Sequence, residues 1–86
     1  MNFKDWTIKV GFHEIDYSSP IEEKQEQKLM EHTIGMLINS YDYMPRIGDL
    51  IGDIEGDAGL FEVEQVQILP NIKTVAFVLS LPEEDD

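Results

Sequence analysis

The run from Lys73 to Leu81 constrains the fold more than any other segment, because it is apolar on both of the faces that a strand presents. Alternate side chains of an extended chain point to opposite sides. One face would carry Val75, Phe77, Leu79 and Leu81, and the other Ala76 and Val78. A strand that is apolar on both faces suits the middle of a sheet, so we expect residues 73–81 to be a central strand.

Two other segments show strand alternation, and both change phase along their length. In residues 6–12 the apolar side chains fall on one face, after which the phase slips, so we expect a bulge near His13 and Glu14. Further on, Phe61 and Val63 would face one way and Glu62 and Glu64 the other, until Val66 and Ile68 shift the phase again. A second bulge is therefore expected in this strand.

Turn residues separate the strands of the second half. The segment from Met44 to Asp49 reads as a turn, because Pro45 has a fixed φ and Gly48 tolerates a positive one. A short strand is expected at 49–54, a hairpin connection at 55–59 and a further turn at Pro70-Asn71.

A helix is expected over about residues 20–31. A serine can cap it, Pro20 suits the first turn, and Ser19 and Glu22 have the spacing of a capping box. Leu29 and Met30 are its expected inward side chains. Residues 33–38 are compatible with helix or strand, and Thr33 and Gly35 favour a strand. The predicted fold class is α+β, with an antiparallel sheet of about four strands and one helix in a single domain of residues 1–81, followed by a disordered acidic tail at 82–86.

Charge is the strongest compositional signal. The 86 residues include 18 acids and six Lys or Arg, a formal net charge of −12. Residues 1–41 hold seven acids and four bases (net −3), and residues 42–86 hold eleven acids and two bases (net −9). This balance disfavours nucleic-acid binding and anionic membranes, both of which need clustered cations. The chain also has no cysteine, and neither a signal peptide nor a membrane span is visible, so we expect a protein of the cytoplasm of a host cell.

A calcium loop is the first chemical hypothesis to test. Residues 53–64 place acids at loop positions 1, 3, 5 and 12, as an EF-hand requires. Position 6, however, is Ala58 where the sharp turn needs glycine, and strands flank the segment in place of helices. A hairpin with carboxylates on its polar face is the preferred interpretation, and no metal ligands or cofactors are assigned.

Catalysis is not expected. Neither His13 nor His32 has metal-ligand spacing, the chain has no glycine-rich phosphate loop, and no serine lies in a nucleophile elbow. Arg46 stands in a region poor in bases, where we expect an ion pair with Asp49 or Asp42 that fixes the turn.

An ordered row of carboxylates is the candidate binding site. Strand residues two apart share a face and lie about 6.6–6.8 Å apart, which applies to Glu62 and Glu64 and, if the strand extends into the loop, to Asp53, Glu55 and Asp57. Such a row would be attracted to a groove lined with Lys and Arg. The alternative is that the acids serve only solubility.

The turn and the strands around it carry a resemblance. Met44-Pro45-Arg46-Ile47-Gly48-Asp49-Leu50-Ile51, followed by Phe61-Glu62-Val63-Glu64-Gln65-Val66 and an apolar strand, resembles small β-rich proteins of phages and mobile elements with a Pro-Arg-x-Gly-Asp turn. The acidic composition separately resembles anti-CRISPR proteins and other nucleic-acid mimics, which share no motif, so no functional residue is carried over.

The charge asymmetry, together with this compositional likeness, leads to the hypothesis of a phage- or mobile-element-type inhibitor that binds a host nucleic-acid-handling defence protein through that protein's basic surface. The alternative is a small structural or adaptor protein that self-associates, for example as a homodimer, and a calcium-binding module ranks third.

Overall fold

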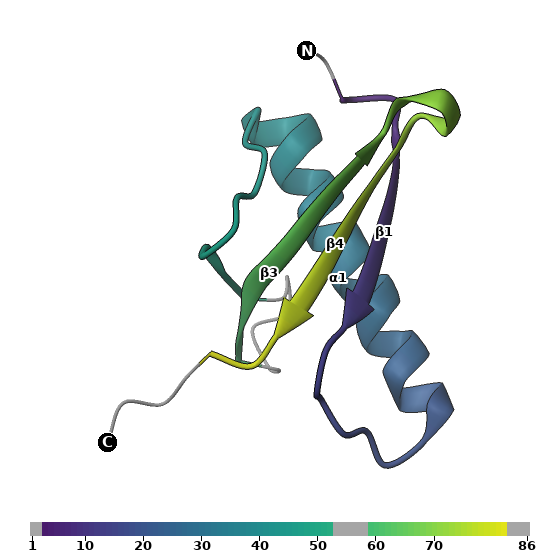
Figure 1. The fold of residues 1–86 in the computed structure, drawn as a ribbon, viewed down its shortest axis with the longest axis vertical. Coiled ribbons are helices and arrows are strands. Elements are labelled where there is room, and N and C mark those ends of the chain that lie inside the picture. The colour runs from purple at the N-terminus through teal and green to yellow at the C-terminus, as the bar shows by residue number, and fades with distance from the viewer. Residues whose placement is uncertain (1–2, 53–58, 83–86) are drawn as a thin grey trace.

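Strand β4 (Thr74–Ser80) lies inside a four-stranded sheet, as its two apolar faces predicted. The computed structural model describes residues 3–52 and 59–82. The other strands are β1 (Thr7–Phe12), β2 (Leu50–Gly52) and β3 (Leu60–Leu69), and the order across the sheet is β1-β4-β3-β2. The one α-helix of the described residues, α1 (Pro20–Tyr41), crosses one face of the sheet, and a short 3₁₀ turn, η1 (Pro70–Ile72), joins β3 to β4 (Figure 1). The α+β prediction is therefore confirmed.

The sheet is mixed, although the sequence had suggested an antiparallel one. β3 runs antiparallel to both β2 and β4, whereas β1 runs parallel to β4. The reason is the number of reversals in the chain. Helix α1 carries the chain back to the end of the sheet where β1 began, so β2 has the direction of β1. Two further reversals, into β3 and then into β4, restore that direction next to β1.

The core lies between α1 and one face of the sheet. Parallel pairing sets Val10 beside Phe77 and Phe12 beside Leu79, and Val63 lies opposite Leu79 on the other side. These side chains meet the helix residues, and the buried cluster consists of Val10, Met30, Ile34, Ile38, Ile51, Phe61, Val63, Val75, Phe77 and Leu79. The opposite side of the sheet, here called the open face, carries Lys9, Glu62, Gln65, Gln67, Ala76, Val78 and Ser80 by register.

One of the two expected bulges is present. Val63 pairs with Leu79, but the next pair is Gln65 with Val78, so Glu64 is the extra residue in β3. At the other position β1 simply ends: Phe12 is its last residue, and Glu14 adopts a left-handed backbone with a φ of 57°. The phase slip in the sequence at His13 and Glu14 therefore marks a strand end.

Helix α1 begins where predicted but ends ten residues later. The Ser19 side chain accepts the backbone N–H of Glu22 at 3.1 Å, and Pro20 is the first residue. The expectation of a strand at 33–38 is wrong, because Met30, Ile34 and Ile38 recur at helical spacing and are all buried against the sheet. The Thr33 hydroxyl, which weakened the helix prediction, donates to the Leu29 carbonyl at 2.9 Å.

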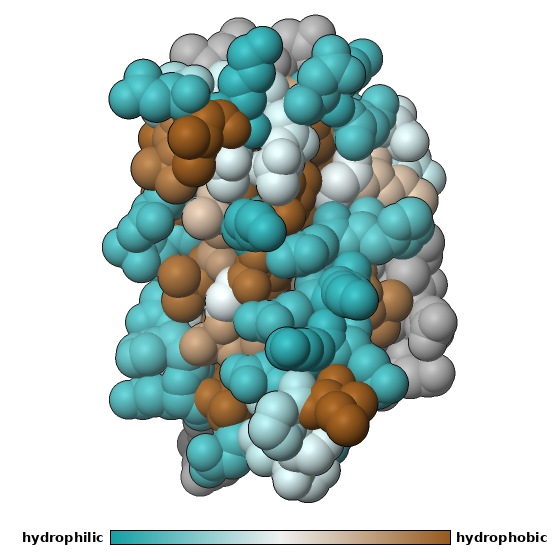
Figure 2. Space-filling model, turned by 90° about the vertical axis from the view of Figure 1, so that its right-hand side faces the viewer, coloured by the Kyte–Doolittle hydropathy of each residue, from teal (hydrophilic) through white to brown (hydrophobic). Residues whose placement is uncertain are grey.

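One side of the molecule, shown in Figure 2, is mainly hydrophilic, and its hydrophobic residues form small separate groups. No helix in the described residues is both long and apolar enough to cross a bilayer. The expected tail at 82–86 lies almost wholly outside the described residues, which end at Pro82.

The two edges of the sheet differ. In β1 the N–H groups of odd-numbered residues face β4, as the bond from the Thr7 N–H to the Lys73 carbonyl shows. The N–H of Val10 therefore points outward, and the Glu31 carboxylate of α1 accepts it at 3.1 Å. Unpaired edge groups invite pairing with other chains, so this contact closes the middle of the β1 edge.

Gly35→Ala should stabilise the protein by about 0.5–1 kcal/mol, because glycine is unfavourable inside a helix and a methyl group there meets nothing within 4 Å. Gly48→Ala is the matched control. It has equal space but a φ of +95°, so it should be destabilising. Urea unfolding measures both changes. A loss of stability in Gly35→Ala would contradict a helix at 33–38.

Glu31→Ala should lower the free energy of unfolding by about 1–2 kcal/mol, because it removes a charged acceptor from the Val10 N–H. It should also promote self-association through the opened edge. Glu31→Gln retains an oxygen acceptor and should lose less. Chemical unfolding and light scattering test the pair, and equal effects of the two substitutions would argue against the edge contact.

Candidate functional site

Glu62 and Glu64 lie together at one end of the open face, as the alternation in β3 predicted. Glu62 pairs with Ser80 of β4 on one side and with Leu50 of β2 on the other. Glu64 is the bulged residue two positions further on. Both line a hollow of about 380 Å³ that is also bordered by His13, Glu14, Ser80 and Leu81. Three carboxylates and one imidazole therefore meet at this end of the sheet.

His13 and Glu14 are the members of this cluster that sequence reasoning missed. His13 Nδ1 lies 2.9 Å from Glu64 Oε2, and His13 Nε2 lies 4.0 Å from Glu14 Oε1. Parallel pairing brings it there, since the His13 N–H donates to the Leu79 carbonyl at 2.9 Å. Because His13 and Glu64 are 51 positions apart, only the topology of the sheet reveals the contact. When protonated, His13 offsets part of the local negative charge.

Three of the five predicted binding residues cannot be placed. Asp53, Glu55 and Asp57 lie outside the described residues, as does the first half (53–58) of the segment considered as a calcium loop. Among the residues that are described, no group of three or more acidic, histidine or cysteine side chains is arranged to hold a metal ion. The candidate site therefore consists of Glu62 and Glu64, joined by His13 and Glu14.

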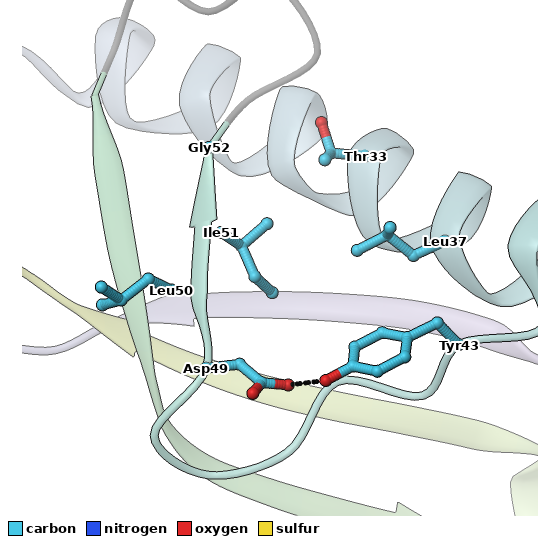
Figure 3. Close-up of a pocket in the computed structure, with 7 residues that line it drawn as sticks. All are labelled: Thr33, Leu37, Tyr43, Asp49, Leu50, Ile51 and Gly52. Carbon is cyan, nitrogen blue, oxygen red and sulfur yellow. Dashed lines mark hydrogen bonds between the residues drawn. The ribbon is translucent and has the colours of Figure 1, made fainter.

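A second hollow, of about 320 Å³, lies between the C-terminal half of α1 and the edge strand β2. In Figure 3, Ile51 points toward Leu37 of the helix, while Tyr43 lies across the lower end of the hollow with its hydroxyl bonded to Asp49. Its lining is largely apolar and consists of Thr33, Leu37, Tyr43, Asp49, Leu50, Ile51 and Gly52. We call it the α1–β2 groove.

Asp49 holds the turn that leads into β2. Its carboxylate accepts the Tyr43 hydroxyl and the Arg46 backbone N–H, the latter at 2.9 Å. The hydrogen bond from Tyr43, followed by that from Arg46, lowers the pKa of Asp49, and the same contact raises the pKa of Tyr43. Gly48, with a φ of 95°, completes the turn, in which the Asp49 N–H donates to the Arg46 carbonyl at 3.0 Å.

The ion pair expected for Arg46 is replaced by these backbone contacts. Within the described residues its guanidinium forms no salt bridge, and Asp42, the other expected partner, lies 3.4 Å from Lys4. The Pro-Arg-x-Gly-Asp pattern is therefore explained by turn geometry, in which Asp49 needs only the main chain of residue 46.

Tyr17 has a large pKa shift. Burial, followed by the charges of Glu26, Glu23 and Glu22, raises its pKa to about 12. Its ring packs on Phe12 with centroids 5.3 Å apart. The resolved shifts of Tyr17, Tyr43 and Asp49 all move away from neutral pH, so none of these three groups becomes a proton donor or acceptor suited to catalysis there.

Comparison with known proteins adds no relative: no protein-family model matches the chain, and neither does any curated protein or solved structure. The resemblance carried by residues 44–51 and 61–66 stays a prediction. Function must therefore be argued from the charge, the two hollows and the sheet edges.

Asp49→Asn should lower stability at neutral pH and progressively less as the solution is acidified. Because folding holds the pKa of Asp49 below its ordinary value of 3.8, the carboxylate stabilises the fold above that value. This contribution is lost as the pH falls through the lowered pKa. Urea unfolding of both proteins from neutral pH down to about pH 2 measures the difference. Tyr43→Phe removes the hydrogen bond that lowers the pKa of Asp49 most, so it should weaken the pH dependence of stability. A stability difference between Asp49→Asn and the native protein that stays constant with pH would contradict this role of Asp49.

Proposed function

We propose that this protein is an acidic inhibitor of the kind made by phages and mobile elements, and that it binds the basic surface of a host nucleic-acid-handling defence protein. The observation that carries the proposal is the meeting of Glu14, Glu62 and Glu64 around one hollow on the open face. Basic grooves that accept nucleic-acid phosphates would accept carboxylates displayed in this way. The protein would then act as an anti-CRISPR-like competitor of nucleic acid.

The rest of the fold supports a role for this surface. Helix α1 covers only one face of the sheet, so Glu62 and Glu64 remain accessible on the other. The net charge of −12 provides long-range attraction that accelerates encounter with a cationic partner. Short-range pairing with arginine would then fix the orientation of the complex.

Charge reversal at this surface tests the proposal. The double variant Glu62→Lys and Glu64→Lys should weaken binding to the partner by more than about 1 kcal/mol and flatten its dependence on salt. Asp5→Lys with Asp16→Lys changes the net charge equally at exposed positions elsewhere and is the matched control. The partner is first captured from host lysate at low salt and released at high salt, and affinities are then measured by titration calorimetry.

Equal losses in the two double variants would show that only net charge matters, and unchanged binding in Glu62→Lys, Glu64→Lys would remove those residues from the site. Competition with the partner's own nucleic acid is the second readout. If the captured protein binds its nucleic acid equally well in the complex, then the mimicry part of the proposal fails.

Self-assembly is the second candidate function, because β2 has no strand on its outer side in the described part of the chain. It calls for a defined oligomer whose formation does not weaken with salt. Sedimentation at low and high salt separates the two candidates, since a monomer with salt-sensitive capture supports the inhibitor and a salt-resistant oligomer supports assembly.

A further inference from the structure

The backbone of β2 offers hydrogen-bonding groups that the rest of the sheet does not use. Val63 N–H donates to the Asp49 carbonyl at 2.9 Å, and the Val63 carbonyl accepts the Gly48 N–H at 2.8 Å, so the Asp49 carbonyl points to β3. The N–H of Leu50 belongs to the same planar peptide group and points the opposite way. Leu50 pairs with Glu62, a position of the antiparallel ladder whose N–H and C=O both point away from β3.

This edge differs from the one at β1. There the Glu31 side chain accepts the outward N–H of Val10, and α1 packs along the strand. At β2, the described residues provide no equivalent acceptor for Leu50 N–H. An extended segment laid beside β2 could bond to both the N–H and the C=O of Leu50.

The surroundings of β2 define which side chains such a segment would carry. Ile51 points to the α1–β2 groove, and Leu50 points to the open face, where 52% of its surface is exposed. Side chains of an added strand alternate in the same way. Those beside Ile51 would lie over the largely apolar groove, next to Leu37 and Tyr43, and those beside Leu50 would lie on the same face as Glu62.

Charge favours a cation on the open-face side. An added strand lies two strand spacings, about 10 Å, from Glu62, a gap that a Lys or Arg side chain and a Glu side chain can span together. A second copy of this chain is a poor occupant, because it also has a net charge of −12 and would meet β2 over only three residues. A homodimer, the second candidate function, would therefore need a larger contact than β2 alone provides.

We propose that β2 is a strand-addition site that accepts an extended segment of a partner protein in which apolar residues alternate with Lys or Arg. The apolar side chains fill the α1–β2 groove, and the cations lie beside Leu50 toward Glu62. The choice of a cationic partner rests on the proposed function, whereas the backbone pairing is independent of it. A three-residue edge makes few bonds, so each contact of this kind is weak on its own.

A synthetic peptide of four Lys-Val repeats with blocked termini is the probe. Amide chemical shifts of the intact protein should change at Leu50 and Ile51 as the peptide is added. A peptide of the same composition, with its four lysines and four valines in separate blocks, has the charge without the alternation. It should therefore bind at least about tenfold more weakly than the alternating peptide.

Leu50→Pro removes the outward N–H at a position where an edge strand tolerates proline. It should weaken binding of the alternating peptide by about tenfold, whereas Leu50→Thr keeps the N–H and should lose much less binding. Two N-methylated peptides make the same test on the unaltered protein, in case proline disturbs the fold. In antiparallel pairing, the lysine opposite Leu50 donates its N–H to Leu50, so methylation of the lysine nitrogens blocks that pairing. In parallel pairing, the neighbouring valine donates, so methylation of the valine nitrogens blocks it. Binding should therefore be lost with one peptide and kept with the other.

The outcomes separate this proposal from the proposed function. If the alternating and block peptides bind equally, or if both methylated peptides still bind, then strand addition is overturned. In that case, a loss of peptide binding in Glu62→Lys, Glu64→Lys would still support an acidic binding surface. Failure of the alternating peptide to bind at millimolar concentration also overturns strand addition, while partner capture from lysate continues to test the inhibitor.

Discussion

The packing of one helix against one face of a four-stranded sheet is the contact on which the rest of the structure depends. Met30, Ile34 and Ile38 supply the helical side of a core whose sheet side comes from β1, β3, β4 and Ile51 of β2. A domain of this size has little apolar surface to spare. The length of α1 is therefore set by the sheet it must cover. The weak helix formers Thr33 and Gly35 are helical because the residues around them are buried against that sheet.

The same contact leaves the other surfaces of the sheet available. The described residues contain one helix, which covers one face of the sheet, and on the open face Glu64 is exposed and Glu62 half-buried. The helix packs along β1 and closes the middle of that edge through Glu31, whereas no described residue adds a strand beside β2 and its groove. The acidic end of the open face and the β2 edge with its groove thus both follow from the position of α1.

Local signals in the sequence predicted the parts of the fold that local physics determines. The cap at Ser19, the turn around Gly48, the central strand and the bulge in β3 each depend on residues close together in the chain. Residues 33–38 could not be assigned in this way, because Ile34, Met36 and Ile38 fit a strand as well as Ile34 and Ile38 fit a helix. What decides between them is the distant sheet that buries Ile34 and Ile38. The contact of His13 with Glu64 depends on parallel pairing of β1 with β4, which appears only once the reversals of the whole chain are counted.

The acidity of the chain has a physical consequence that bears on its role. Glu14, Glu62 and Glu64 repel one another at the end of the sheet, and the fold places His13 against Glu14 and Glu64, where it carries a positive charge only when protonated. Like charges held this close destabilise a small domain, and the described structure offers only partial compensation. A ligand that binds only the folded state stabilises it, and one that brings cations to this end would also relieve the repulsion. Acids that serve only solubility would repel one another less if they were spread over the surface than if they were gathered around one hollow. The cluster at this end of the sheet is therefore more informative about function than the net charge.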